Sequence, residues 1–264
     1  MEMRSVKLLF GFLHYRRAVL AGALILVIAA AWGYLLWGAG IEMRMGGDPM
    51  MAIPPKWNLP YGGLILAMWI VMMMAMMLPS AAPTVLLVTV LAEDRLDNSR
   101  LVPVAAMMFA SGYLLVWCGF SLAATLLQWS LDQAAFLSET MALTNAILAS
   151  AILIAAGVYQ WTPLKDACLR HCRSPTAFLV SHWRQGMLGA VRIGTCHGLF
   201  CLGCCWMLMS LSFVGGLMNL AWVGAIALFV LVEKAVAKGD WVSRLCGMLL
   251  IVWGGANLAR LLWG

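Results

Sequence analysis

The feature that most constrains this chain is a series of apolar runs, each about long enough to cross a membrane. A transmembrane helix needs about 20 predominantly apolar residues, and seven such runs fit into 264 residues. Only 11% of the residues are charged, whereas soluble domains carry roughly 25%. Because a bilayer offers no partner to unpaired backbone groups, the runs must be helical. The sequence therefore predicts an all-α polytopic membrane protein, with residues 1–264 forming a single integral-membrane helical domain.

The predicted spans are Ala18–Trp37, Gly62–Leu91, Leu101–Trp129, Ala142–Trp161, Ile193–Val214, Leu217–Val232 and Leu245–Leu262. Seven transmembrane helices are expected. The alternative is six, which changes only the side of the membrane on which the C-terminus lies. Pro79 and Pro83 lie inside the second span and predict a kink or a break there.

The basic residues indicate the orientation of the chain. With a cytoplasmic N-terminus, 14 of the 17 Lys and Arg residues fall on the inner side, as the positive-inside rule requires. These charges are scattered over loops and form no stripe, so nucleic acid is not an expected partner. The lipid bilayer is the expected surrounding, and the chain allows an oligomer.

A cluster of cysteines in the fifth span is the first candidate site. No charged residue occurs between Arg192 and Glu233, so this stretch should lie inside the membrane. On a helix turning about 100° per residue, one face presents the side chains of His197, Cys201, Cys204 and Cys205. Thiols and imidazole are ligands for soft and borderline metals, here Cu(I) or Zn(II). Thiol redox chemistry and simple burial of small apolar side chains remain alternatives. Gly194 and Gly198 form a small-xxx-small pair that lets another helix approach.

A second cysteine pair lies in the basic inner loop. Thr162 can cap a helix whose first residue is Pro163, which makes Cys168 and Cys172 neighbours at positions i and i+4. His171 lies beside that face, so these three residues form a candidate metal site. A redox pair and loop packing are the alternatives. His182, also in the inner segment, is expected to lie at the membrane interface without binding metal.

Methionines supply a third set of soft atoms. Met68, Met72 and Met76 recur at i+4 in the second span and form a stripe, whose thioethers suit Cu(I). Packing is the competing interpretation, because Met commonly fills gaps in cores. The outer loop adds Met43, Met45, Met50 and Met51. Glu233, at the end of the sixth span, is either a proton or metal ligand or a local partner of Lys234.

Four segments together resemble an uncharacterised bacterial family described only as predicted metal-binding integral membrane proteins. They are Tyr159-Gln160-x-Thr162-Pro163-Leu164-Lys165-x-x-Cys168-Leu169-x-x-Cys172-Arg173-x-Pro175, Cys201-x-Gly203-Cys204-Cys205-Trp206-x-Leu208-Met209, Glu233-Lys234 and Met73-Met74-Ala75-Met76-Met77-Leu78-Pro79-Ser80. The resemblance covers most of the chain after the first loop. It implies a multi-pass protein of the bacterial inner membrane, and it implies no known activity.

The leading hypothesis is a soft-metal membrane protein, with copper as Cu(I) the expected ion, that acts in transport, delivery or homeostasis and exchanges the ion with a cytoplasmic metal carrier. One alternative is a membrane thiol–disulfide oxidoreductase coupled to quinone, since Cys201 and Cys204 form a C-x-x-C pair. The other is an accessory subunit of a larger membrane complex. No nucleotide-binding motif occurs, and an enzymatic role is the less expected one.

Overall fold

The computed structural model describes residues 2–38, 57–95, 101–138, 140–184, 186–236 and 240–263. These ranges contain ten helices and one isolated β-bridge, between Leu137 and Leu143. The helices are α1 (Glu2–Leu36), α2 (Leu59–Arg95), α3 (Val102–Gln133), α4 (Ala146–Tyr159), α5 (Pro163–Arg173), α6 (Pro175–His182), α7 (Met187–Ser210), α8 (Ser212–Gly215), α9 (Leu220–Ala235) and α10 (Asp240–Trp263).

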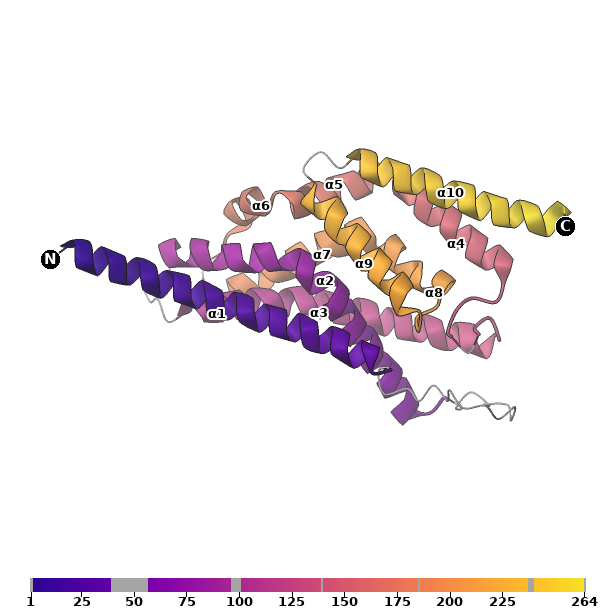
Figure 1. Ribbon diagram of the computed structural model, residues 1–264, viewed down its shortest axis with the longest axis horizontal. Helices are drawn as coiled ribbons and strands as arrows, with labels where there is room; N and C mark the ends of the chain where they lie inside the picture. Colours follow the sequence, from indigo (N-terminus) through magenta and orange to yellow (C-terminus); the bar gives the residue numbers. More distant parts are fainter. Residues whose placement is uncertain are drawn as a thin grey trace.

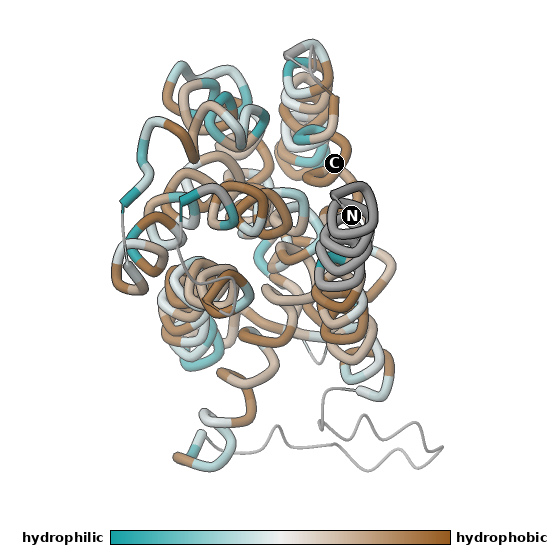
Figure 2. The backbone as a smooth tube through the Cα atoms, turned by 90° about the vertical axis from the view of Figure 1, so that its left-hand side faces the viewer, coloured by the Kyte–Doolittle hydropathy of each residue, from teal (hydrophilic) through white to brown (hydrophobic). Residues whose placement is uncertain are grey.

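Five helices in the described ranges are long and apolar enough to cross a membrane. The segments are Arg17–Leu36, Leu59–Glu93, Val102–Gln133, Met187–Gly215 and Trp241–Trp263. A sixth is added if α4 and α5, which meet at a bend of 64°, count as one span. The described part of the chain is thus all-helical and carries several membrane-length helices, as the sequence predicts. Hydrophobic positions predominate along the helical tubes in Figure 2.

The count of seven spans is not confirmed. The predicted sixth span corresponds to α9, which has only 16 residues and is therefore about 24 Å long, short of the roughly 30 Å hydrocarbon core. The predicted fourth span corresponds to α4, which has 14 residues and bends into α5. In the second span α2 stays a single helix with Pro79 and Pro83 inside it, and Figure 1 shows it changing direction partway along.

The helices pack as two groups joined by short elements. Helices α1, α2, α3 and α7 lie side by side, and α4 pairs with α10 (Figure 1). Helix α5 packs on α7, and α9 packs on α2. The core is built largely from α2, α3 and α7 and includes Trp69, Tyr113 and Trp117, which are almost completely buried. This arrangement surrounds the cysteine-bearing part of α7 with other helices.

Glycines permit the closest of these approaches, between α3 and α7. A Cβ atom added at Gly194 would lie 2.0 Å from the carbonyl oxygen of Phe109 on α3. Gly194→Ala must therefore push the two backbones apart, and we expect it to lower the free energy of unfolding by about 1–3 kcal/mol. The measurement is thermal unfolding of the detergent-purified protein.

Gly119→Ala is the matched control, because nothing lies within 4 Å of a Cβ atom added there on α3. It should leave the melting temperature unchanged or raise it slightly, since Ala favours helices over Gly by up to about 1 kcal/mol. Equal melting temperatures for the two variants would contradict the close approach of α3 and α7.

Candidate metal site

Helix α7 brings three of the predicted cysteines into the interior. Cys201, Cys204 and Cys205 are each at most 1% exposed. The thiols of Cys204 and Cys205 both donate to the backbone carbonyl of Cys201, at 3.0 and 2.9 Å. The two thiol protons are therefore accepted by one carbonyl oxygen of the same helix. An ion that displaced these protons would free both sulfurs as ligands.

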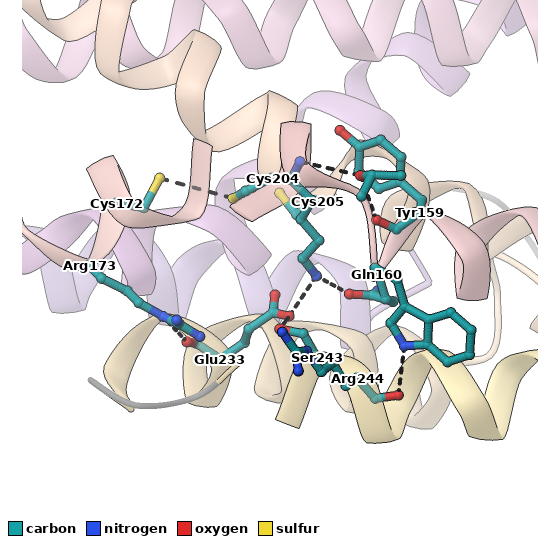
Figure 3. Close-up of polar contacts among 12 residues, drawn as sticks. Tyr159, Gln160, Cys172, Arg173, Cys204, Cys205, Glu233, Ser243 and Arg244 are labelled. Atoms are coloured by element: carbon teal, nitrogen blue, oxygen red, sulfur yellow. Dashed lines mark hydrogen bonds and ion pairs between the residues drawn. The ribbon is translucent and has the colours of Figure 1, made fainter. Parts of the chain in front are cut away.

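Helix α5 supplies a fourth thiol. The predicted start of this helix is confirmed: Pro163 is its first residue, and the Thr162 side chain accepts a hydrogen bond from the Lys165 backbone N–H at 3.3 Å. The helix packs on α7 and places the Cys172 sulfur 4.0 Å from the Cys204 sulfur (Figure 3). The two cysteine motifs, about 30 residues apart in sequence, thus meet at one place.

The remaining thiol of the second motif, Cys168, lies against Gly203 of α7. A Cβ atom added at Gly203 would be 2.7 Å from the Cys168 sulfur, so a glycine is needed for this contact. The Tyr159 hydroxyl donates to the carbonyl oxygen of the same glycine. Three positions of the motifs recognised in the sequence therefore form one packed contact between α4, α5 and α7.

One methionine sulfur reaches the thiols. The Cys205 thiol lies 3.9 Å from the Met77 sulfur of α2, and Met77 is the residue after the predicted stripe ends. Met68, Met72 and Met76 are buried in the same core, each 1–2% exposed. The outer-loop methionines Met43, Met45, Met50 and Met51 lie outside the described residues.

The Cys201 sulfur faces two polar groups from other helices. The Lys234 ammonium and the Tyr113 hydroxyl each lie 3.0 Å from it. The same ammonium donates to the Ser80 hydroxyl at 3.0 Å, and the Tyr113 hydroxyl also donates to the Met77 carbonyl at 3.3 Å. A cation at this distance from a sulfur stabilises the thiolate form, which is the form that binds metal. Sequence reasoning missed both Tyr113 and the role of Lys234 at the cluster, because neither belongs to a ligand pattern.

Glu233 does not pair with its neighbour Lys234. Its carboxylate accepts from the Lys165 ammonium of α5 at 2.5 Å, and neither side chain is exposed. Ser243 of α10 donates to the same oxygen at 2.5 Å, and the Gln160 side chain accepts from Lys165 (Figure 3). Arg173 donates to the Glu233 carbonyl at 3.0 Å. This network joins α4, α5, α9 and α10 beside the thiols.

The histidines occupy aromatic surroundings. His197 is 3% exposed, and its ring lies 5.7, 5.8 and 5.3 Å from the rings of Phe109, Tyr113 and Phe178. Its Nδ1 atom is buried without a hydrogen-bond partner. The ring of His171 stacks on Phe200 at 4.1 Å. The structure therefore brings Cys172, Cys201, Cys204 and Cys205 together. It places His197 and His171, the two predicted histidines, against phenylalanines.

Among the described residues, there is no group of three or more His, Cys, Asp or Glu side chains that could hold a metal ion. The sulfur atoms instead form two close pairs, Cys172 with Cys204 and Cys205 with Met77. With metal–sulfur bonds of about 2.3 Å, two sulfurs on one ion are about 3.8 Å apart in tetrahedral geometry and about 4.6 Å apart in linear geometry. Both observed separations fall in this interval.

A family model matches the part of the chain that contains this cluster. The model of the PpoB2 family, described as "Copper chaperone", matches residues 66–257. That range contains α3 to α9 with most of α2 and α10, and every residue of the sulfur cluster. No curated protein and no solved structure matches the chain. The match covers more than half of the sequence, and the chain belongs to the PpoB2 copper chaperone family.

Proposed function

We propose that this protein binds Cu(I) at the sulfur cluster between α5, α7 and α2 and passes the ion to other carriers. The observation that carries the proposal is the 4.0 Å separation of Cys172 and Cys204, which come from different helices and different motifs. The copper chaperone description of the family supports the choice of copper.

The chemistry of the atoms present favours a soft, low-coordinate ion. The cluster offers thiols and one thioether, which select Cu(I), and no carboxylate or water ligand is needed. Zn(II) requires four ligands in a tetrahedron, and only two of the four thiols are held as a close pair by the observed contacts. A two- or three-coordinate ion would fit with smaller movements of the helices.

Exchange with a cytoplasmic carrier would proceed through α5. This helix carries Cys172 at the cluster and Cys168, which is partly buried. Ligand exchange between neighbouring sulfurs avoids a bare ion in an apolar interior, where an unpaired charge is very costly. The positive-inside distribution of Lys and Arg assigns α5 to the cytoplasmic side, so transfer would occur there.

Thiol–disulfide chemistry is the second candidate, and the same sulfur pair favours it. Closing Cys172 and Cys204 from 4.0 Å to the roughly 2.05 Å of a disulfide requires only a small shift of α5. Such a protein would form the bond when a quinone accepts the two electrons, and both thiol protons would be released. The two functions differ in whether the reduced cluster retains copper.

The test is copper binding by the purified full-length protein under anaerobic, reducing conditions against a competing Cu(I) chelator. We expect the wild type to retain Cu(I) at the cluster and the Cys172→Ser/Cys204→Ser variant to lose at least about 100-fold in affinity, because loss of even outer-shell partners costs 10–100-fold. Cys118→Ser is the matched control. Because Cys118 is exposed on α3, this variant should bind copper with the affinity of the wild type.

Failure of the reduced wild type to retain copper would overturn the proposal. Formation of a Cys172–Cys204 disulfide on addition of a quinone, found by mass spectrometry of alkylated peptides, would then establish the redox alternative. Equal loss of copper in the Cys118→Ser control would show that the effect does not come from the cluster.

A further inference from the structure

Two histidines that are not fully buried meet where α5 and α6 lie next to each other. The rings of His171 and His182 have centroids 6.5 Å apart, and both contact Phe178, at 6.3 and 4.7 Å. His171 is half-buried and His182 is exposed. Sequence spacing grouped His171 with Cys168 and Cys172, whereas the fold places its ring beside His182.

The hydrogen bonds of the two rings leave the same atom available on each. His171 Nδ1 lies 2.8 Å from the Ala167 carbonyl oxygen, and His182 Nδ1 lies 3.1 Å from the Phe178 carbonyl oxygen. A carbonyl oxygen only accepts, so each of these hydrogen bonds forms in the tautomer that carries its hydrogen on Nδ1; the Ser181 hydroxyl also lies 2.9 Å from His182 Nδ1. In that tautomer the lone pair of Nε2 stays available for a ligand. Metal-binding histidines usually have this arrangement, in which one nitrogen donates to a carbonyl and the other binds the ion.

The separation of the rings is close to that of two imidazoles on one ion. With metal–nitrogen bonds of about 2.0–2.1 Å and ring nitrogens about 1.1 Å from the ring centre, two such centroids lie about 5 Å apart in tetrahedral and about 6.3 Å apart in linear geometry. The observed 6.5 Å is nearest to the linear arrangement. Rotation of the exposed His182 ring would close the remaining few tenths of an ångström.

The surroundings favour a monovalent ion. Helix α5 carries Arg170 and Arg173 on either side of His171–Cys172, and their charges repel a divalent ion more strongly than a monovalent one. Imidazole is a suitable ligand for copper. Two neutral imidazoles in near-linear geometry add no charge, so the site would hold Cu(I) with a net charge of +1.

We propose that His171 and His182 form a second Cu(I) site, ligated by nitrogen, between the sulfur cluster and the surface. His197 lies between the two sites: its ring is 5.3 Å from Phe178 and 5.8 Å from Tyr113, whose hydroxyl contacts Cys201. The buried and unpartnered Nδ1 of His197 offers one more nitrogen along this line. The inference rests on the proposed function for the identity of the ion.

The experiment titrates the full-length protein in detergent with Cu(I), held by bathocuproine disulfonate, and follows each equivalent by X-ray absorption. We expect the wild type to bind one ion with sulfur ligands and a second, weaker ion with nitrogen ligands. His182→Asn and His171→Asn should each lose the second ion and keep the first, because Asn retains a donor for the backbone carbonyl and lacks Nε2. His182 is exposed, so its variant tests the site without disturbing the interior.

Ser181→Ala is the matched control, since the Ser181 hydroxyl contacts His182 Nδ1 at 2.9 Å and its loss leaves both Nε2 atoms in place. It should bind two ions. A wild type that binds only the sulfur-ligated ion, or a His182→Asn variant that keeps two, would overturn the second site. A nitrogen-bound ion without a sulfur-bound one would instead overturn the proposed function and leave this site standing, whereas no bound copper would overturn both.

Discussion

Glu233→Gln is expected to lower the free energy of unfolding by about 3–5 kcal/mol, the usual cost of removing one partner from a buried ion pair. The substitution keeps the shape of the side chain and leaves the Lys165 ammonium, which is not exposed, without a countercharge. The network that holds α5 against α9 and α10 would weaken. Since α5 carries Cys172, we also expect weaker copper binding.

Thermal unfolding in detergent and copper affinity are the two measurements for this prediction. The Lys165→Met/Glu233→Leu double variant should unfold at a higher temperature than either single variant, because apolar replacement of a whole buried pair is often neutral or stabilising. Arg244→Gln, an exposed charge on α10, is the control and should change stability by less than about 0.5 kcal/mol. If Glu233→Gln melts like this control, the ion pair does not hold the helices together.

Lys234→Met is expected to reduce the affinity for Cu(I) by at least about tenfold, which corresponds to about 1.4 kcal/mol. In the proposed complex two thiolates and one Cu(I) would carry a net charge of −1, and the Lys234 ammonium, 3.0 Å from the Cys201 sulfur, would make the assembly neutral. Two unit charges at this separation attract each other by about 5.5 kcal/mol at an effective dielectric constant of 20. The cost of removing the ammonium from water offsets much of this gain, so the expected net effect is smaller.

Competition with a Cu(I) chelator measures the affinity. Lys234→Arg keeps the charge and should retain most of the wild-type affinity for Cu(I). Arg260→Gln, at the exposed end of α10, should leave the affinity unchanged. An undiminished affinity in Lys234→Met, with an unchanged melting temperature, would show that the cation does not stabilise the copper-bound cluster.

Much of the helical layout could be predicted from the apolar runs. Each of the seven predicted spans overlaps a helix, from the first run in α1 to the last in α10. The start of α5 could also be predicted, because a Thr cap followed by Pro is a local signal that needs no distant partner. The number of membrane crossings could not be predicted from the sequence, because α4 and α9 are too short to span a membrane alone and their placement depends on the helices around them.

The candidate site, like the fold, could be predicted only in part from the sequence. Helical periodicity placed Cys201, Cys204 and Cys205 on one face of α7, and all three are buried. The contacts of Cys172 with Cys204 and of Met77 with Cys205 join segments that are 32 and 128 residues apart. A local pair of Lys234 with Glu233 was one interpretation of the sequence, and the Lys234 ammonium contacts the Cys201 sulfur instead. Such contacts depend on how helices pack, which periodicity does not specify.

The sequence alone therefore determined that the chain is helical, apolar enough for a membrane and rich in soft ligand atoms on particular helix faces, because these properties follow from composition and the 3.6-residue period. Only the tertiary structure decided which of those atoms meet. The glycine-mediated approach of α3 to α7 and the Lys165–Glu233 pair set the positions of α7 and α5. Sulfur separations of about 4 Å depend on helix positions to within a few tenths of an ångström, and those positions are fixed by packing between residues distant in sequence.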